Sequence, residues 1–235
     1  FRWRGWWAYG CGAIGDMAVH NADPAFWAFE LGLPVKVKGD TFGEGPASIA
    51  YPKKSRIEMT FAPNKWIPKG IDLVWTDGGV LPPEKEVPGL AEFVKTQKNG
   101  KLPGNGLIII GTKATTIGGS HAAPPACIAG DKAAFAAAYE KAEKAYPFYS
   151  HYREFIDACL AEKPMACGSR LQYAAPLTEA LLIGCISLRF PGQTLAFDPS
   201  GLAFTNNDAA NVFLKAPKRG DWDFAKLDRP WWRFW

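Results

Sequence analysis

The sequence has no apolar run long enough to cross a membrane. Its longest apolar stretches, Leu107–Ile110 and Ala180–Ile186, are far shorter than the roughly 20 residues that a spanning helix needs. No internal repeat is visible, and hydrophobic residues make up 48% of the 235 positions, as in ordinary globular domains. These absences exclude a membrane protein, a coiled coil, a collagen-like fibre and a repeat solenoid.

Concentrated charge of one sign is also missing. The net charge is +4, and the densest basic cluster is only Lys53, Lys54 and Arg56. Proteins that bind nucleic acid gather their positive charge into a patch or stripe more strongly than this. We therefore expect no nucleic-acid partner.

The familiar catalytic and metal-binding signatures are absent as well. The five cysteines include no Cys-x-x-Cys pair and no cysteine–histidine group with zinc spacing. The chain contains no Gly-x-Ser-x-Gly elbow, no P-loop and no His-Glu-x-x-His. We expect reduced thiols, with a single disulfide left open, and no metal site.

The elements that the patterns predict are mixed. A helix is expected from Ile14 to His20, and Asp23-Pro24 resembles the cap and first turn of a new helix that ends at Gly32. Further helices are expected at 131–145, 150–160 and 176–188, and short strands at 35–38, 55–61, 71–75, 107–110, 194–197 and 202–204. This pattern favours an α+β fold with a mainly antiparallel sheet.

Gly10-Cys11-Gly12-Ala13-Ile14-Gly15 fits the dinucleotide-binding pattern G-x-G-x-x-G. That pattern needs a buried strand before it and an acidic residue at the end of a second strand. The preceding residues are rich in Trp and Gly, and the region around Glu30 is predicted as helix. The alternative is a glycine-rich turn whose backbone passes close to a neighbour and then opens a helix.

Asp16 and His20 lie four residues apart on the first predicted helix. This spacing places both side chains on one face. A carboxylate beside an imidazole can hold the ring and help it to move a proton near neutral pH. A surface pair or a cap is the alternative for these two residues taken alone. We expect the other histidines, His121 in a loop and His151 at a helix start, to be structural or solvated.

The chain resembles a known family at several separate motifs. The first is Gly10-x-Gly12-Ala13-Ile14-Gly15-Asp16-Met17-x-x-His20-x-x-Asp23-Pro24-x-Phe26-Trp27. The others are Trp75-Thr76-Asp77-Gly78-Gly79 with Pro82-Pro83, His151–Cys159, Ala175–Ala180 and Phe204-Thr205-Asn206-Asn207. Together they are similar to the substrate domain of the glucose–fructose oxidoreductase/inositol dehydrogenase (Gfo/Idh/MocA) family.

The resemblance implies a large open, mainly antiparallel sheet with helices packed on one face. It covers only the C-terminal domain of such enzymes, so residues 1–235 are expected to form one substrate-binding and oligomerisation domain. The N-terminal Rossmann domain that binds NAD or NADP would lie outside this chain, and we expect that something precedes Phe1. This chain alone is then expected to be inactive. A homodimer or homotetramer through the open sheet face is also implied, and the tryptophan-rich tail from Ala216 is expected to dock on the domain or on a partner subunit.

Site residues follow from the resemblance by position. His20 would be the acid/base that takes the proton from a hydroxyl of a sugar or polyol, and Asp16 would orient it. Asp23 and Tyr9 would bind substrate, although Asp23 could equally cap the next helix.

Two other functions remain as alternatives at this point. One is a non-catalytic carbohydrate-binding or scaffold module derived from this domain. The other is an NAD-dependent enzyme that cleaves glycosides with the help of a redox step.

Overall fold

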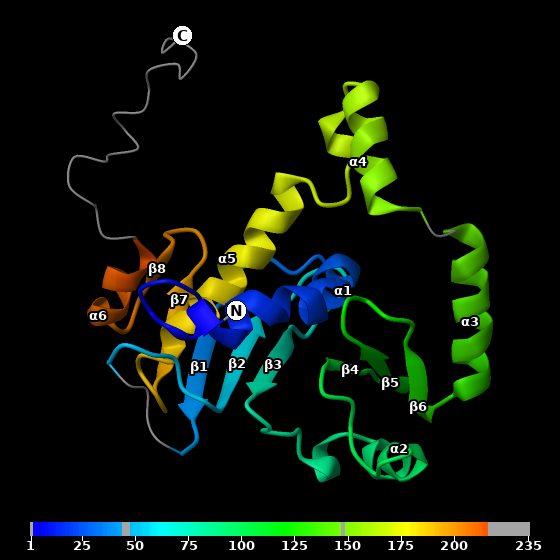
Figure 1. Cartoon of the computed structure of the whole chain (residues 1–235), viewed down its shortest axis with the longest axis horizontal. Coiled ribbons are helices and arrows are strands. Elements are labelled where there is room, and N and C mark those ends of the chain that lie inside the picture. The colour runs from blue at the N-terminus through cyan, green and yellow to red at the C-terminus, as the bar shows by residue number, and fades with distance from the viewer. Residues whose placement is uncertain (1, 44–47, 147–148, 216–235) are drawn as a thin grey trace.

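A computed structural model describes residues 2–43, 48–146 and 149–215 (Figure 1). Its strands are β1 (Lys36–Thr41), β2 (Ser55–Phe61), β3 (Ile71–Asp77), β4 (Gly106–Ile110), β5 (Ala114–Gly119), β6 (Ala126–Gly130), β7 (Thr194–Asp198) and β8 (Ala203–Phe204). Its α-helices are α1 (Val19–Phe29), α2 (Leu90–Thr96), α3 (Lys132–Ala145), α4 (His151–Leu160), α5 (Leu171–Ser187) and α6 (Asp208–Asn211). Shorter helical turns are η1 (Arg2–Gly5), η2 (Ile14–Ala18), η3 (Glu84–Glu86), η4 (Pro164–Ala166) and η5 (Val212–Leu214).

A five-stranded sheet forms the main body, in the order β3-β2-β1-β7-β8 with every neighbouring pair antiparallel. In β2 buried and half-buried residues alternate, because successive side chains of a strand point to opposite faces. Met59 of β2 lies opposite Val37 of β1 on one side and Leu73 of β3 on the other. This confirms the expected α+β class with a mainly antiparallel sheet.

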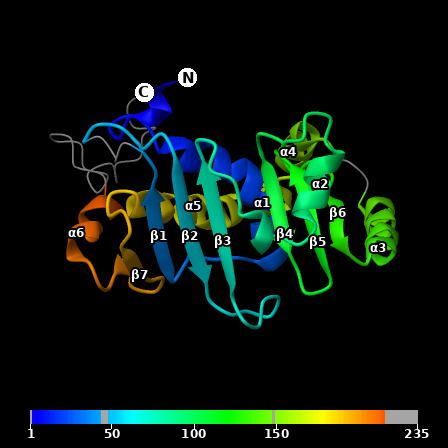
Figure 2. The same cartoon turned by 90° about the horizontal axis from the view of Figure 1, so that it is seen from below.

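Helices α1 and α5 cover one face of this sheet, as Figure 2 shows. Ile57 and Met59 point to that face and are fully buried, together with Leu181 of α5 and Phe26 of α1. The residues between them on β2, such as Arg56 and Glu58, lie on the other face and are only half-buried. The core therefore sits between the sheet and the two helices, and one side of α1 is buried in it.

A second, three-stranded sheet in the order β4-β5-β6 lies beside α1, with α2 and α3 flanking it (Figures 1 and 2). Ile117 and Thr115 of β5 are buried in this sheet, and Leu90 of the flanking helix α2 is buried as well. Strands β5 and β6 have no counterpart in the sequence-based prediction. Their sequences are rich in Gly, Ala and Thr, so they lack the regular alternation of apolar and polar residues that predicts a strand. The pairing of β5 with β6 is also shifted between Thr115 and Thr116.

Two predicted helix boundaries were wrong. The chain does not restart at Asp23, because Pro24 lies inside a continuous α1. That helix ends at Phe29 with Glu30 in the left-handed region, which is a common way to close a helix. Helix α5 begins at Leu171, five residues before the expected start, and carries Pro176 inside it.

The described cysteines are all free thiols, which settles the open question of a disulfide among them. Within the described part of the chain no helix is long and apolar enough to cross a bilayer. The expected docking of the tail from Ala216 lies outside the described residues.

Candidate functional site

The glycine-rich turn at Gly10–Gly15 brings the chain close to its neighbours before the first helix. A Cβ on Gly10 would lie 2.4 Å from the backbone of Arg4, and one on Gly12, whose φ is +70°, would lie 2.6 Å from the ring of Tyr51. The residues before it form the turn η1 and not a buried strand. The interpretation as a close-approach turn is therefore confirmed, and the buried strand that the dinucleotide-binding pattern needs before it is not formed by these residues.

The turn opens directly into η2, a π-helical turn that continues into α1. Such π-helical turns have a wider repeat than an α-helix and occur often at functional sites. Asp16 lies within η2 and His20 lies in α1.

Asp16 forms an ion pair with Arg4 of η1, and both side chains are partly exposed. No hydrogen bond joins Asp16 to His20 in the described part of the chain. The direct contact through which Asp16 was expected to orient His20 is therefore not made.

His20 is exposed on α1 and stacks on His121 from the turn between β5 and β6. The ring centroids are 4.3 Å apart and the ring planes meet at 26°. The sequence placed His121 correctly in a loop, but no pattern in it indicated that this loop reaches α1. The stacked pair joins the main body to the second sheet.

Asp23 accepts a hydrogen bond of 2.5 Å on Oδ1 from the hydroxyl of Tyr173 in α5, which also lies 3.1 Å from the backbone oxygen of Asp23. Burial, and then the bond to Asp23, raise the pKa of the Tyr173 phenol well above its usual range. The prediction that Asp23 caps a new helix was wrong, because α1 runs through it. Its carboxylate is instead held in a fixed position at the α1–α5 contact.

Trp27 follows one turn further along α1 and is 54% exposed. Its ring meets Tyr173 edge-on, with centroids 4.8 Å apart, and the Arg170 guanidinium lies 6.0 Å from its centroid. His20, Asp23 and Trp27 are spaced by three and four residues, so they share one face of α1. At ~1.5 Å per residue this face is about 10 Å long from His20 to Trp27.

Tyr9 lies apart from this face. It is 67% exposed, and its ring packs edge-on against Trp3, with centroids 5.1 Å apart. No hydrogen bond or ring contact links Tyr9 to His20 or Asp23 among residues that the structure describes. The geometry thus places His20 and Asp23 on one face of α1, brings His121 against His20 and leaves Tyr9 in the N-terminal turn.

Other motifs behind the resemblance have structural roles. Asp77 accepts hydrogen bonds from the backbone N–H and hydroxyl of Ser55 and from the indole of Trp75, which ties β2 to β3. Asn206 accepts a bond from the backbone N–H of Ala196 and so fastens the end of β8 to β7.

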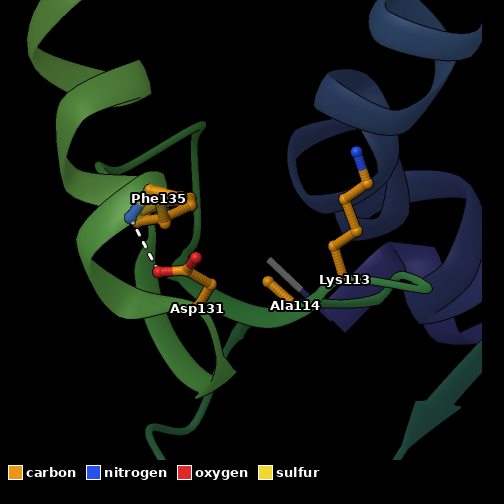
Figure 3. Close-up of a pocket in the computed structure, with 5 residues that line it drawn as sticks. Lys113, Ala114, Asp131 and Phe135 are labelled. Carbon is orange, nitrogen blue, oxygen red and sulfur yellow. Dashed lines mark hydrogen bonds between the residues drawn. The ribbon is translucent and has the colours of Figure 1, made fainter.

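The described residues contain no group of three or more His, Cys, Asp or Glu side chains able to hold a metal ion. A hollow of about 550 Å³ lies where β5 begins and β6 leads into α3 (Figure 3). Its one carboxylate, Asp131, accepts a 2.9 Å bond from the backbone N–H of Ala134 and caps α3. Asp131 is therefore engaged in this cap, and no histidine of the described chain lines the hollow.

Comparison with known proteins adds no further information: no protein-family model matches the chain, and no curated protein is significantly similar to it.

Proposed function

We propose that this chain is the substrate-binding part of an NAD(P)-dependent oxidoreductase that acts on a hydroxyl of a sugar, polyol or glycoside. The observation that carries the proposal is the single face of α1 that presents His20, Asp23 and an exposed Trp27. An imidazole suits proton transfer near neutral pH, a fixed carboxylate accepts hydroxyl hydrogen bonds, and a flat aromatic ring covers the apolar side of a sugar.

His20 takes the proton from the reacting hydroxyl in this proposal. Removing that proton while the carbon loses hydride avoids a protonated carbonyl product. Asp23, held by Tyr173, fixes a neighbouring hydroxyl and so sets which carbon is presented. The nicotinamide, bound by a domain outside this chain, supplies the hydride acceptor.

The test is turnover of sugars and polyols by a protein in which this chain is joined to a nucleotide-binding domain. We expect His20→Asn to lower kcat by ~10²–10⁴-fold, as for loss of a general acid/base. Equal turnover of wild type and His20→Asn would contradict the role of His20.

His151→Asn is the matched control, because His151 is exposed at the start of α4, where its ring meets that of Tyr152 at an interplanar angle of 38°. It should leave kcat unchanged. Product analysis separates simple oxidation, which yields a carbonyl, from redox-assisted glycoside cleavage, which releases an aglycone.

The second candidate is a non-catalytic carbohydrate-binding module, and the single observation that favours it is the exposed side chain of Trp27. It predicts sugar binding that is unchanged in His20→Asn and no turnover with either nicotinamide cofactor.

A further inference from the structure

The imidazole of His20 has an orienting contact, but it is not the expected one. The carboxylate of Asp16 forms an ion pair with Arg4, whereas the ring of His121 stacks on the face of the His20 ring. A carboxylate partner would occupy one of the ring nitrogens. A stacked partner restrains the ring plane through its face and leaves both nitrogens at the edge free for substrate.

The turn that carries His121 has an unusual backbone. His121 and the next residue, Ala122, both lie in the left-handed region, with φ of +59° and +53°. Two successive non-glycine residues in this region are energetically costly, and such strain persists only where the surrounding structure holds it. The turn between β5 and β6 therefore presents the imidazole of His121 at the expense of local stability.

The residues next to His20 and His121 in the sequence each carry a buried polar atom without a described partner. Asn21, the residue after His20, is only 6% exposed, and its Oδ1 has no hydrogen-bond partner among the described residues. Ser120, the residue before His121, has a buried Oγ that also lacks a described partner. Buried polar atoms are rarely left unpaired, and strain, a functional role or a bound water accounts for most of those that are.

We propose that His121 is the positioning residue for the imidazole of His20. This inference rests on the proposed function, in which His20 is the acid/base. By stacking at 4.3 Å, His121 restricts rotation of the His20 ring and aims a ring nitrogen at the substrate hydroxyl. The second sheet then contributes to the site through this turn, and Asp16 stabilises the start of the helix through Arg4.

The experiment is NMR of the imidazole C–H groups in the full 235-residue chain, at about pH 8.5, well above the usual imidazole pKa of ~6.5. Protons over the face of an aromatic ring are shifted upfield by its ring current. We expect His121→Ala to move the His20 ring protons downfield toward the position of a solvent-exposed histidine. His121→Phe restores a stacked ring and should restore the upfield shift.

Asp16→Asn is the matched control and should leave the His20 ring protons in place. Backbone amide spectra of the same samples show whether each variant keeps the fold. If His121→Ala unfolds the turn, Ala122→Gly relaxes the strained backbone and keeps both rings, and it too should retain the upfield shift. The inference is overturned if His121→Ala leaves the His20 signals unchanged, or if Asp16→Asn moves them as far.

This readout does not depend on turnover, so the two proposals can fail separately. If His121→Ala loses the upfield shift but keeps the full turnover that depends on His20, the positioning role of His121 is overturned and the proposed function stands. An intact upfield shift without turnover on any hydroxyl substrate overturns the function.

Discussion

Tyr173 and Asp23 show how one half-buried contact connects α5 to the candidate site. The Tyr173 hydroxyl donates to Asp23 at 2.5 Å and its ring supports Trp27. Burial and this bond raise the pKa of the phenol, so the folded protein favours its protonated form. In the unfolded chain the same phenol loses its proton near pH 10.

A pH dependence follows from this shift. Because the folded pKa lies above the unfolded value, the stabilisation is complete below about pH 10 and is lost as the pH rises beyond it. We expect wild type to be more stable than Tyr173→Phe near pH 8, and this advantage to shrink above pH ~10. Urea unfolding of both proteins at the two pH values measures it. A constant difference would show that the Tyr173 phenol titrates normally.

Among single residues, His20 and Asp23 could be selected from the sequence as site candidates, whereas their partners could not. The i, i+3, i+7 spacing of His20, Asp23 and Trp27 is visible along the chain. Tyr173 lies 150 residues from Asp23, and His121 reaches His20 only through the turn between β5 and β6. Contacts of this kind depend on tertiary packing, which local patterns do not contain.

At the scale of elements, prediction succeeded where periodicity was regular. The alternating residues of β2 gave its bounds, and α3 and α4 were predicted to within one residue. It failed at prolines and in short, glycine-rich strands. Asp23-Pro24 has the local signature of a helix start, but packing of α1 on α5 keeps the helix continuous, so tertiary contacts override the local signal.

Contact between β1 and α5 depends on a glycine. A Cβ on Gly39 would lie 2.6 Å from the Ser187 hydroxyl and 2.9 Å from the Ser187 backbone. Because backbone must move to make room, we expect Gly39→Ala to lower the free energy of unfolding by ~1–3 kcal/mol.

Gly32→Ala is the control, since a Cβ at Gly32 meets nothing within 4 Å. Denaturant unfolding of both variants gives the comparison. Equal midpoints for the two would show that α5 packs less closely on β1 than the structure describes.

For the molecule as a whole, the open face of the five-stranded sheet is the proposed site of self-association. Charged pairs such as Lys38 with Asp40 and Arg56 with Glu58 lie on it. Val74 of β3, which is opposite Glu58, lies on the same face and is 45% exposed. A face that carries both signs of charge can match a second copy of itself about a two-fold axis.

We expect a solution mass of at least twice the 25.7 kDa of one chain, measured by light scattering after size exclusion. Val74→Glu places a second carboxylate beside Glu58 and should shift the protein toward the monomer. A monomeric wild type would contradict this assembly without affecting the site on α1.

The central claim is that the face of α1 binds a sugar or polyol, and the most direct measurement is binding to the chain itself. Calorimetric titration with a panel of sugars, polyols and glycosides compares wild type with Trp27→Ala and with Trp66→Ala, whose indole is exposed to a similar extent, 55% against 54%. The account predicts that at least one compound binds, that Trp27→Ala weakens it at least tenfold, and that Trp66→Ala leaves it unchanged. Binding that survives Trp27→Ala, or no binding by any compound of the panel, would contradict it.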